Sequence, residues 1–233
     1  LFMKKMLNDF GGLTTVIFIS GAVLIAVLLV IISMRQSSVK INLDTFDNTQ
    51  RINILERQEG DPFAKIKMIE FSDFQCPYCK IFHEKLMPQI RQEFINTGIA
   101  TLEYYPMVFL GPDSINASKG AICAQDQNQF WFYHDLLFHI QTPDHNNGTY
   151  DRSSLFNLAD YIYTQDKNFN LSEFENCYDS GEVEVYLTQL EKQATEYGIQ
   201  STPTLVIEGV AIRGVQDISV YRQVIDKVLE DKQ

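Results

Sequence analysis

The sequence predicts an α/β fold with a helical insertion for most of the chain, preceded by one transmembrane helix. Three features lead to this prediction. An apolar run over residues 65–71 reads as a buried strand and leads directly into the start of a helix. Several helical patterns then separate this unit from two short strands near the C-terminus. Ahead of these elements, residues 13–34 contain no charged side chain.

Residues 13–34 are long enough to cross a membrane as a helix, which takes roughly 20 apolar residues. A cleaved signal peptide is the alternative. Its apolar region is usually only about 7–15 residues long, and no convincing small-x-small cleavage site precedes Arg35. We therefore expect residues 1–12 as an N-terminal segment, 13–34 as an uncleaved signal anchor, and the polar stretch 35–60 as a linker.

Residues 61–233 are expected to form one domain. After the strand over 65–71, a helix runs from Cys76 to about Thr97, is kinked or interrupted by Pro88 and stops at Gly98. Ile99 to Tyr105 then alternates as a second strand.

A helical insertion follows at about 112–196. Its helical patterns lie at about 113–127, 129–140, 151–164 and 172–196. After the insertion, residues 203–208 and 210–213 form a hairpin around Glu208-Gly209. Asp217 caps a final helix that ends near Asp231.

The composition narrows the class of function. A content of 45% hydrophobic and 12% aromatic residues is typical of a globular protein with a sizeable core. The net charge of −11 argues against a nucleic-acid partner, because phosphate binding needs clustered Lys and Arg.

Cys76 and Cys79 form a C-x-x-C at the start of the first helix. Cys76 would face unpaired backbone N–H groups and the positive end of the helix dipole, which favours the thiolate. The thiolate is the species that attacks disulfides, so the spacing indicates a redox dithiol. A structural zinc site is the alternative, but it normally needs a second ligand pair and only His83 is near.

Three segments together resemble the DsbA-like (BdbD-like) thiol-disulfide oxidoreductases of the thioredoxin superfamily. Residues 70–79, EFSDFQCPYC, are similar to the active-site segment of that family. Residues 129–138, QFWFYHDLLF, resemble its inserted-helix signature, and residues 197–205, YGIQSTPTL, resemble the loop that carries its cis-proline. The resemblance covers about residues 61 to 230 and implies a thioredoxin fold with an inserted helical subdomain.

The resemblance implies roles for the residues around the dithiol. Cys76 and Cys79 would be catalytic, with Pro77 and Tyr78 as the active-site loop between them. Glu70 would be a buried acid that exchanges a proton with Cys79. The alternative for Glu70 is a water-exposed position at an edge or end of its strand.

The loop at Thr202-Pro203 would lie against the dithiol. The resemblance implies a cis-proline at Pro203 and a role for Thr202 in tuning Cys76, with the preceding backbone free to pair with a bound peptide. Sequence alone would favour a plain turn, because cis bonds occur in only about 5–6% of X-Pro pairs in folded proteins.

The resemblance also implies a location and partners. Charges do not orient the anchor, since Lys4 and Lys5 precede it and Arg35 and Lys40 follow it. The family works outside the cytoplasm, so we expect residues 1–12 in the cytoplasm and the catalytic domain on the other side of the cell membrane. There it would introduce disulfides into exported cysteine-containing polypeptides, without a cofactor, and a membrane-bound partner would reoxidise it.

Two other functions remain open at this point. Pro77-Tyr78 also occurs between the cysteines of reducing enzymes, so a disulfide reductase or isomerase is possible. A non-catalytic module that binds peptides during assembly belongs to a different class.

Cys123 and Cys177 lie on two predicted insertion helices. We predict a structural disulfide between them, with two small buried core residues as the alternative. No metal site is expected. His134 and His139 are five positions apart, a poor spacing for one helix face, and neither they nor His145 suggest a ligand set.

Overall fold

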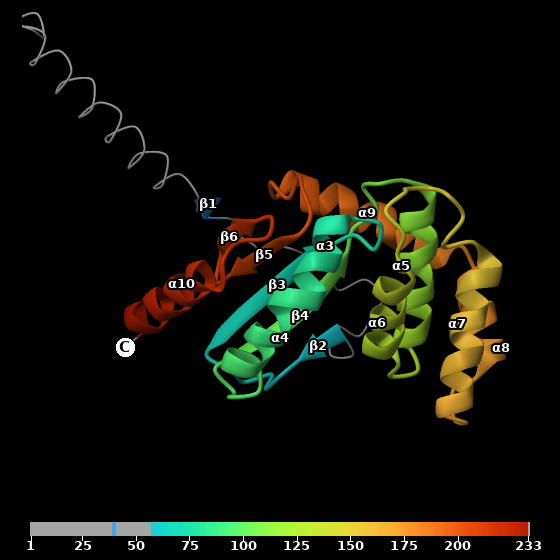
Figure 1. Cartoon of the computed structure of the whole chain (residues 1–233), viewed down its shortest axis with the longest axis horizontal. Helices are drawn as coiled ribbons and strands as arrows, with labels where there is room; N and C mark the ends of the chain where they lie inside the picture. Colours follow the sequence, from blue (N-terminus) through green and yellow to red (C-terminus); the bar gives the residue numbers. More distant parts are fainter. Residues whose placement is uncertain (1–38, 41–56, 233) are drawn as a thin grey trace, which may run out of the picture. The chain divides into compact units, whose positions relative to one another are not determined.

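The computed structural model describes residues 39–40 and 57–232. The chain divides into two compact units, Leu1–Val39 and Lys40–Gln233, and the second is described here (Figure 1). The predicted anchor at 13–34 and most of the linker at 35–60 lie outside the described residues, and so does the whole of 1–12. Within the described ranges, no helix combines the length and apolar character needed to cross a membrane.

A mixed β-sheet forms the centre of the second unit. Its strands lie in the order β6, β5, β3, β4, β2. Their bounds are β2 (Gln58–Glu59), β3 (Ile66–Ser72), β4 (Ala100–Pro106), β5 (Thr204–Ile207) and β6 (Val210–Arg213), and the two-residue β1 (Val39–Lys40) lies at the boundary between the units. β3 and β4 are parallel, whereas β5 is antiparallel to β3, β6 to β5 and β2 to β4. The strand that leads to the C-x-x-C is therefore central in the sheet.

β3 lies at the centre of the sheet and is buried on both faces. Of its seven residues, only Lys67 is exposed, which is typical of a strand covered on both sides. The hairpin between β5 and β6 turns at Glu208 and Gly209, whose φ angles are +46° and +82°. Both angles lie in the left-handed region that a tight hairpin turn requires.

One helical run continues from Pro77 to Ile95 beside the sheet. It consists of α3 (Pro77–Ile81), η2 (Phe82–Leu86), α4 (Met87–Ile90) and η3 (Arg91–Ile95). The η segments are wider turns, in which Met87 N–H donates to the Phe82 carbonyl five residues back. Pro88 has no backbone N–H to donate the hydrogen bond to the carbonyl four residues back. This accounts for the interruption of the helix that the sequence predicts at this residue.

The insertion contains five helices. They are α5 (Pro112–Gln125), α6 (Phe130–Ile140), α7 (Arg152–Gln165), α8 (Leu171–Asp179) and α9 (Glu182–Glu196). The prediction of a single helix over 172–196 is wrong, because the helix is interrupted at Ser180 and Gly181. Gly181 has a φ of +74°, a left-handed conformation that a glycine adopts without steric cost, and this ends α8.

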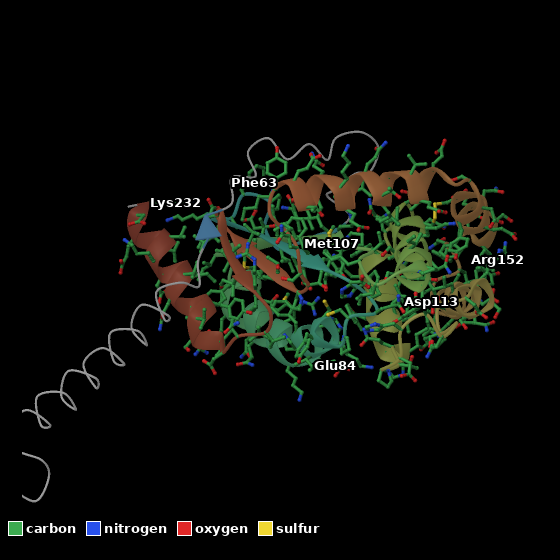
Figure 2. The ribbon with its side chains drawn as sticks, turned by 90° about the horizontal axis from the view of Figure 1, so that it is seen from above. Phe63, Glu84, Met107, Asp113, Arg152 and Lys232 are labelled. Atoms are coloured by element: carbon green, nitrogen blue, oxygen red, sulfur yellow. A yellow bond between two sulfur atoms is a disulfide. The ribbon has the colours of Figure 1, made fainter. Side chains whose placement is uncertain are left out.

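The insertion packs against the start of the active-site helix. α5 to α8 gather at one end of the sheet, and α9 leads back towards it (Figure 1). Cys76 and Cys79 belong to the same buried cluster as Tyr133, Leu137 and Phe138 of α6. Figure 2 shows Met107 in the interior beneath α9, where it packs with Leu190 and Ala194.

The last helix, α10 (Ile218–Asp231), covers the sheet near β3. It starts as the sequence predicts, with the Asp217 carboxylate accepting a hydrogen bond from Ser219 N–H at 2.9 Å. Tyr221 on this helix packs against Phe82 of the active-site helix, with ring centroids 6.1 Å apart.

Candidate active site

Cys76 and Cys79 occupy different environments on the same turn. Cys76 is the N-cap residue of α3, with an extended backbone at φ −74° and ψ 119°, and Pro77 is the first helical residue. Both cysteines are free thiols. Cys76 has 7% of its surface exposed and Cys79 has none, whereas Tyr78 between them is 64% exposed. Both cysteines are therefore largely buried, and Cys76 is the more accessible of the two.

The electrostatics of the two thiols are opposite. A hydrogen bond from the Cys79 thiol, followed by contributions from the Thr202 side chain and the N–H groups of Cys79 and Tyr78, lowers the pKa of Cys76 to about 6. Burial raises the pKa of Cys79 well above its ordinary value, and the neighbouring Cys76 raises it further. Near neutral pH, Cys76 is a thiolate and Cys79 a thiol.

The loop at Thr202 and Pro203 lies directly beside Cys76. The bond between these two residues is cis. Cys76 Sγ lies 3.4 Å from the Thr202 carbonyl oxygen. Thr204, the next residue, starts β5 and is paired with Phe71 of β3. The sheet thus brings together two segments that lie more than a hundred residues apart in sequence.

Glu70 lies in the middle of β3 and is only 2% exposed. It is paired with Tyr104 of β4 and Leu205 of β5, so the water-exposed alternative is wrong. Burial raises the pKa of its carboxyl group to about 7. The Ser72 hydroxyl lies close enough to lower the pKa of both Glu70 and Cys79, although it forms no hydrogen bond of normal geometry with either.

Asp73 is a second buried acid, which sequence reasoning missed. Its Oδ1 accepts hydrogen bonds from Ser114 Oγ at 2.7 Å and Gln75 N–H at 2.8 Å, and its Oδ2 accepts one from Leu110 N–H at 3.2 Å. Its own N–H lies 3.4 Å from Cys79 Sγ. Despite these bonds, burial raises the pKa of the carboxyl group to about 6. Asp73 therefore fastens the loop before Cys76 to the insertion.

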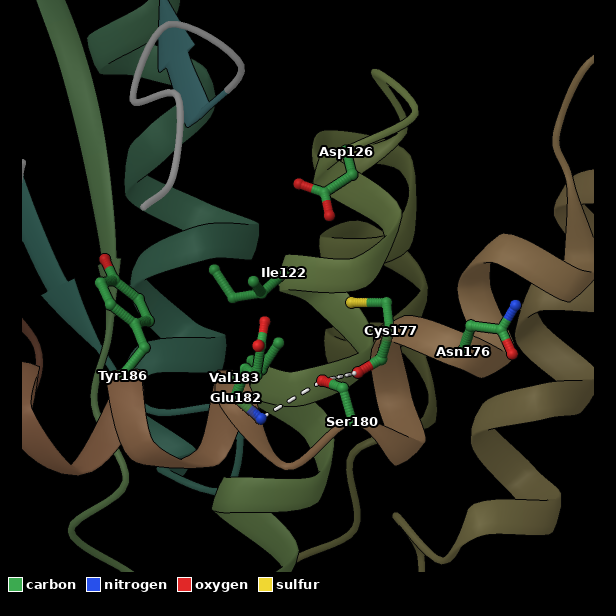
Figure 3. Close-up of a pocket in the computed structure, with 8 residues that line it drawn as sticks. All are labelled: Ile122, Asp126, Asn176, Cys177, Ser180, Glu182, Val183 and Tyr186. Atoms are coloured by element: carbon green, nitrogen blue, oxygen red, sulfur yellow. Dashed lines mark hydrogen bonds between the residues drawn. The ribbon is translucent and has the colours of Figure 1, made fainter. Parts of the chain in front are cut away.

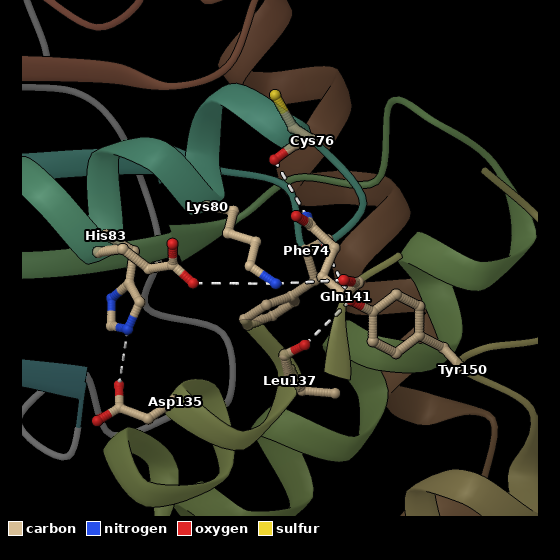
Figure 4. Close-up of polar contacts among 9 residues, drawn as sticks. Phe74, Cys76, Lys80, His83, Asp135, Leu137, Gln141 and Tyr150 are labelled. Carbon is tan, nitrogen blue, oxygen red and sulfur yellow. Dashed lines mark hydrogen bonds and ion pairs between the residues drawn. The ribbon is translucent and has the colours of Figure 1, made fainter. Parts of the chain in front are cut away.

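Gln141 and Tyr150 also form hydrogen bonds with the loop that precedes Cys76 (Figure 4). Gln141 Nε2 donates to the carbonyl oxygens of Phe74, at 2.5 Å, and Cys76, at 3.1 Å. Tyr150 Oη donates to the Phe74 carbonyl at 2.9 Å. Gln141 is the C-cap residue of α6, so the end of an insertion helix sets the backbone around Cys76.

A protein-family model described as thioredoxin matches residues 53–227. The chain belongs to this thioredoxin family. Disulfide bond formation protein D of Bacillus subtilis is 27% identical over 178 residues, which cover 74% of this chain and 77% of that protein. The probable disulfide bond formation protein D of Bacillus cereus is 25% identical over 208 residues, 88% of this chain and 93% of that relative.

Solved structures share the fold of this thioredoxin-family chain. Oxidised BdbD from Bacillus subtilis superposes with a TM-score of 0.66 at 22% identity, covering 83% of this chain and 98% of BdbD. The thiol-disulfide exchange protein α-DsbA2 from Wolbachia pipientis has a TM-score of 0.61 at 17% identity. The match covers 76% of this chain and 88% of the α-DsbA2 chain. With the dithiol at the helix start, the family and these relatives identify the chain as a thiol-disulfide oxidoreductase.

The other two cysteines of this oxidoreductase form a disulfide. Cys123 of α5 is bonded to Cys177 of α8, with Cα atoms 5.7 Å apart and a sequence separation of 54. A cavity of about 400 Å³ lies beside the bond, between α5, α8 and α9 (Figure 3). Its lining is Ile122, Asp126, Asn176, Cys177, Ser180, Glu182, Val183 and Tyr186. Neither Cys76 nor Cys79 lines it.

The histidines are arranged differently from the sequence-based expectation. His139 is exposed and so is His145. His83 on the active-site helix instead meets His134 and Asp135 of α6, and one ligand atom of each lies within 4.8 Å of the others. Sequence reasoning judged His83 and His134 separately, because nothing local to either residue indicates that the two helices meet.

Proposed function

We propose that this thiol-disulfide oxidoreductase acts as an oxidant that introduces disulfides into exported polypeptides. The observation that carries the proposal is the opposite shift of the two thiol pKa values, down to about 6 for Cys76 and up for Cys79. Stabilising a thiolate stabilises the reduced dithiol, and a stable reduced form makes the corresponding disulfide a stronger oxidant.

The proposed reaction proceeds through a mixed disulfide at Cys76. A substrate thiolate attacks Cys76 Sγ of the Cys76–Cys79 disulfide and breaks that bond, with Cys79 leaving as a thiolate that takes up a proton. The second substrate thiolate then attacks the substrate sulfur of the mixed disulfide and releases Cys76 as a thiolate. Two electrons have moved from the substrate to the enzyme.

Glu70 is proposed to supply the proton that Cys79 needs. With a pKa of about 7, its carboxyl group is partly protonated at neutral pH and can both give and accept a proton. Ser72 lies near both groups and offers a hydroxyl for the transfer. This role requires no cofactor.

The surface beside Cys76 is proposed to bind the substrate as an extended chain. Thr202 and Pro203 lie beside Cys76, and the exposed side chain of Tyr78 follows two residues after it. Backbone groups near a strand end are suited to pairing with an extended peptide.

We further propose residues 13–34 as a membrane anchor, with 1–12 in the cytoplasm, 35–60 as a linker and 61–233 as the catalytic domain outside. The uncharged length of 13–34 supports the anchor. A membrane-bound oxidase would restore the disulfide. Protease digestion of intact cells tests this topology: the domain should be degraded from outside, and its protection would contradict the proposal.

A redox titration of the purified protein against glutathione buffers tests the direction of electron flow. We expect a potential nearer to that of the strong oxidant DsbA, about −120 mV, than to that of thioredoxin, about −270 mV. A potential near the thioredoxin value would instead favour the reductase. No exchange with cysteine peptides at all would leave only the peptide-binding module.

A further inference from the structure

His83, His134 and Asp135 bring three potential ligand atoms to one point between two helices. His83 Nε2 lies 3.5 Å from Asp135 Oδ1, and His134 Nδ1 lies 2.9 Å from the same oxygen. Figure 4 shows His83 reaching from the active-site helix towards Asp135 on α6. Ligands that are each about 2.0–2.2 Å from a tetrahedral metal lie about 3.3–3.6 Å from one another. One distance to Asp135 Oδ1 lies in that range and the other below it, and all three atoms lie within 4.8 Å, so small side-chain shifts would bring them around one ion.

His134 is enclosed by aromatic side chains. The side chain is buried and its Nε2 has no hydrogen-bond partner among the described residues. Aromatic rings surround it with centroids 4.7–5.8 Å away, from Phe74, His83, Tyr104, Phe130, Trp131 and Phe138. This packing holds the ring with Nδ1 facing the Asp135 carboxylate, 2.9 Å away.

His134 Nδ1 and Asp135 Oδ1 are a hydrogen-bonding pair at 2.9 Å, and His83 Nε2 lies 3.5 Å from the same oxygen. An imidazole nitrogen binds a metal through its lone pair, so a cation here would take the place of the hydrogen that His134 and Asp135 share. The same position is within reach of His83, so two imidazole nitrogens and one carboxylate oxygen, from two helices, face one point.

We propose that His83 Nε2, His134 Nδ1 and Asp135 Oδ1 bind one divalent transition-metal ion, with zinc as the metal whose chemistry fits best. Two imidazoles and one carboxylate suit zinc and its neighbours, whereas calcium and magnesium prefer oxygen ligands alone. The side chain of Asp135 is 52% exposed, so water can supply a fourth ligand. The nearby positive charge of Arg91 is offset by its ion pair with Glu59, at 2.8 Å.

The metal would join the active-site helix to the insertion. His83 lies one turn after Cys79, and His134 and Asp135 lie on the helix that ends at Gln141. The ion would therefore fix α6 against the helix that carries the dithiol. This proposal is independent of the direction of disulfide exchange, and it can be tested without an activity assay.

The test uses the fully oxidised protein. All four cysteines are then in disulfides, so no thiol competes for metal. Zinc is titrated calorimetrically, and cobalt is added as a spectroscopic probe of the ligand geometry. The variant is His83→Gln, and the matched control is His139→Gln, which changes an exposed histidine of the same α6 that lies outside the cluster.

We expect one zinc ion per chain, at least a 10-fold weaker affinity in His83→Gln, and an unchanged affinity in His139→Gln. Asp135→Asn should weaken binding in the same way, which guards against misfolding of the His83 variant. No saturable binding below about 1 mM, or equal affinity in wild type and both cluster variants, overturns the proposal. Equal affinities would assign the binding to exposed carboxylates of this acidic chain. Calcium competing as well as cobalt would also contradict it.

Discussion

Cys76 and Cys79 lie at the start of one helix, whereas Cys123 and Cys177 lie 54 residues apart on two helices of the insertion. All four residues belong to or pack against the same buried cluster. The first pair is reduced, and polar groups lie beside its sulfur atoms: the Thr202 carbonyl beside Cys76 and the N–H of Asp73 beside Cys79. The second pair is bonded and joins α5 to α8.

The difference shows that surroundings, more than the cysteines themselves, separate a reactive pair from a structural one. Hydrogen bonds lower the pKa of Cys76, so the completed exchange releases Cys76 as a stabilised thiolate. We infer that the Cys123–Cys177 bond contributes stability by closing a long loop of chain. Substitutions at or beside one cysteine pair should therefore affect exchange and stability differently from substitutions at the other pair.

The largest expected effect follows Cys76→Ser. The variant should lose disulfide exchange completely, because no exposed sulfur remains to form the mixed disulfide. Oxidation of a synthetic peptide with two cysteines, followed by mass spectrometry, measures the loss. Cys79→Ser is the matched control. Given the peptide in its disulfide form, its Cys76 thiolate should attack that disulfide and form a mixed disulfide, releasing the second peptide sulfur as a thiol. Residual exchange in Cys76→Ser would contradict the assignment.

The double variant Cys123→Ala/Cys177→Ala should retain exchange and lose stability. Closing a loop of 54 residues contributes ~4 kcal/mol in the chain-entropy model, and measured values are often smaller. Unfolding by denaturant measures the loss in the free energy of unfolding. The matched variant Cys76→Ala/Cys79→Ala should show no comparable loss. A double variant with unchanged stability but impaired exchange would reverse the roles of the two pairs.

Glu70→Gln should become increasingly more stable than wild type as pH rises. The folded state holds the Glu70 proton more tightly than the unfolded state, with a pKa of about 7 against 4.5, so wild-type stability falls as pH rises from about 4.5 through 7. At 1.36 kcal/mol per pKa unit, the gain of the variant should grow by roughly 3 kcal/mol between pH 4 and pH 8.

Unfolding of both proteins across this pH range provides the measurement. The variant should also exchange disulfides more slowly, because Cys79 loses its proton donor, while the Cys123–Cys177 bond stays intact. A pH-independent difference in stability would show that Glu70 is not titrating in the folded protein near neutral pH.

The smallest effect is expected for Gln141→Ala. It removes two hydrogen bonds to the carbonyls of Phe74 and Cys76 and should cost about 1–2 kcal/mol. It should also shift the pKa of Cys76. Gln127→Ala is the control, since Gln127 Nε2 makes a similar bond to the Asn170 carbonyl at an exposed position of the insertion. Equal Cys76 titration curves in both variants would show that Gln141 does not position the dithiol.

The sequence predicts the parts of this structure that depend on local signals. A strand that runs into a helix-start C-x-x-C, the turn at Glu208-Gly209 and the cap at Asp217 are each specified by neighbouring residues. The break at Gly181 was missed, because a single glycine within a helical pattern is compatible with either a continuous helix or a stop.

Contacts between distant segments could not be predicted in the same way. The two-residue β2 becomes a strand only by pairing with β4. Gln141 and Asp73 look like ordinary polar residues until folding brings them to the active-site loop. His83 and His134 meet only because α6 packs against the active-site helix. The resemblance to a known family supplied Pro203, which no local rule would have selected.

The most direct test of the account is the pH dependence of alkylation at each cysteine of the reduced dithiol. Reaction with iodoacetamide at a series of pH values, followed by peptide mapping, gives the titration of Cys76 and Cys79 separately. The account predicts that Cys76 reacts with an apparent pKa of about 6, and that Cys79 stays unmodified at neutral pH. Titration of Cys76 near the free-thiol value of about 8.5, or equal reactivity of the two thiols at neutral pH, would contradict it.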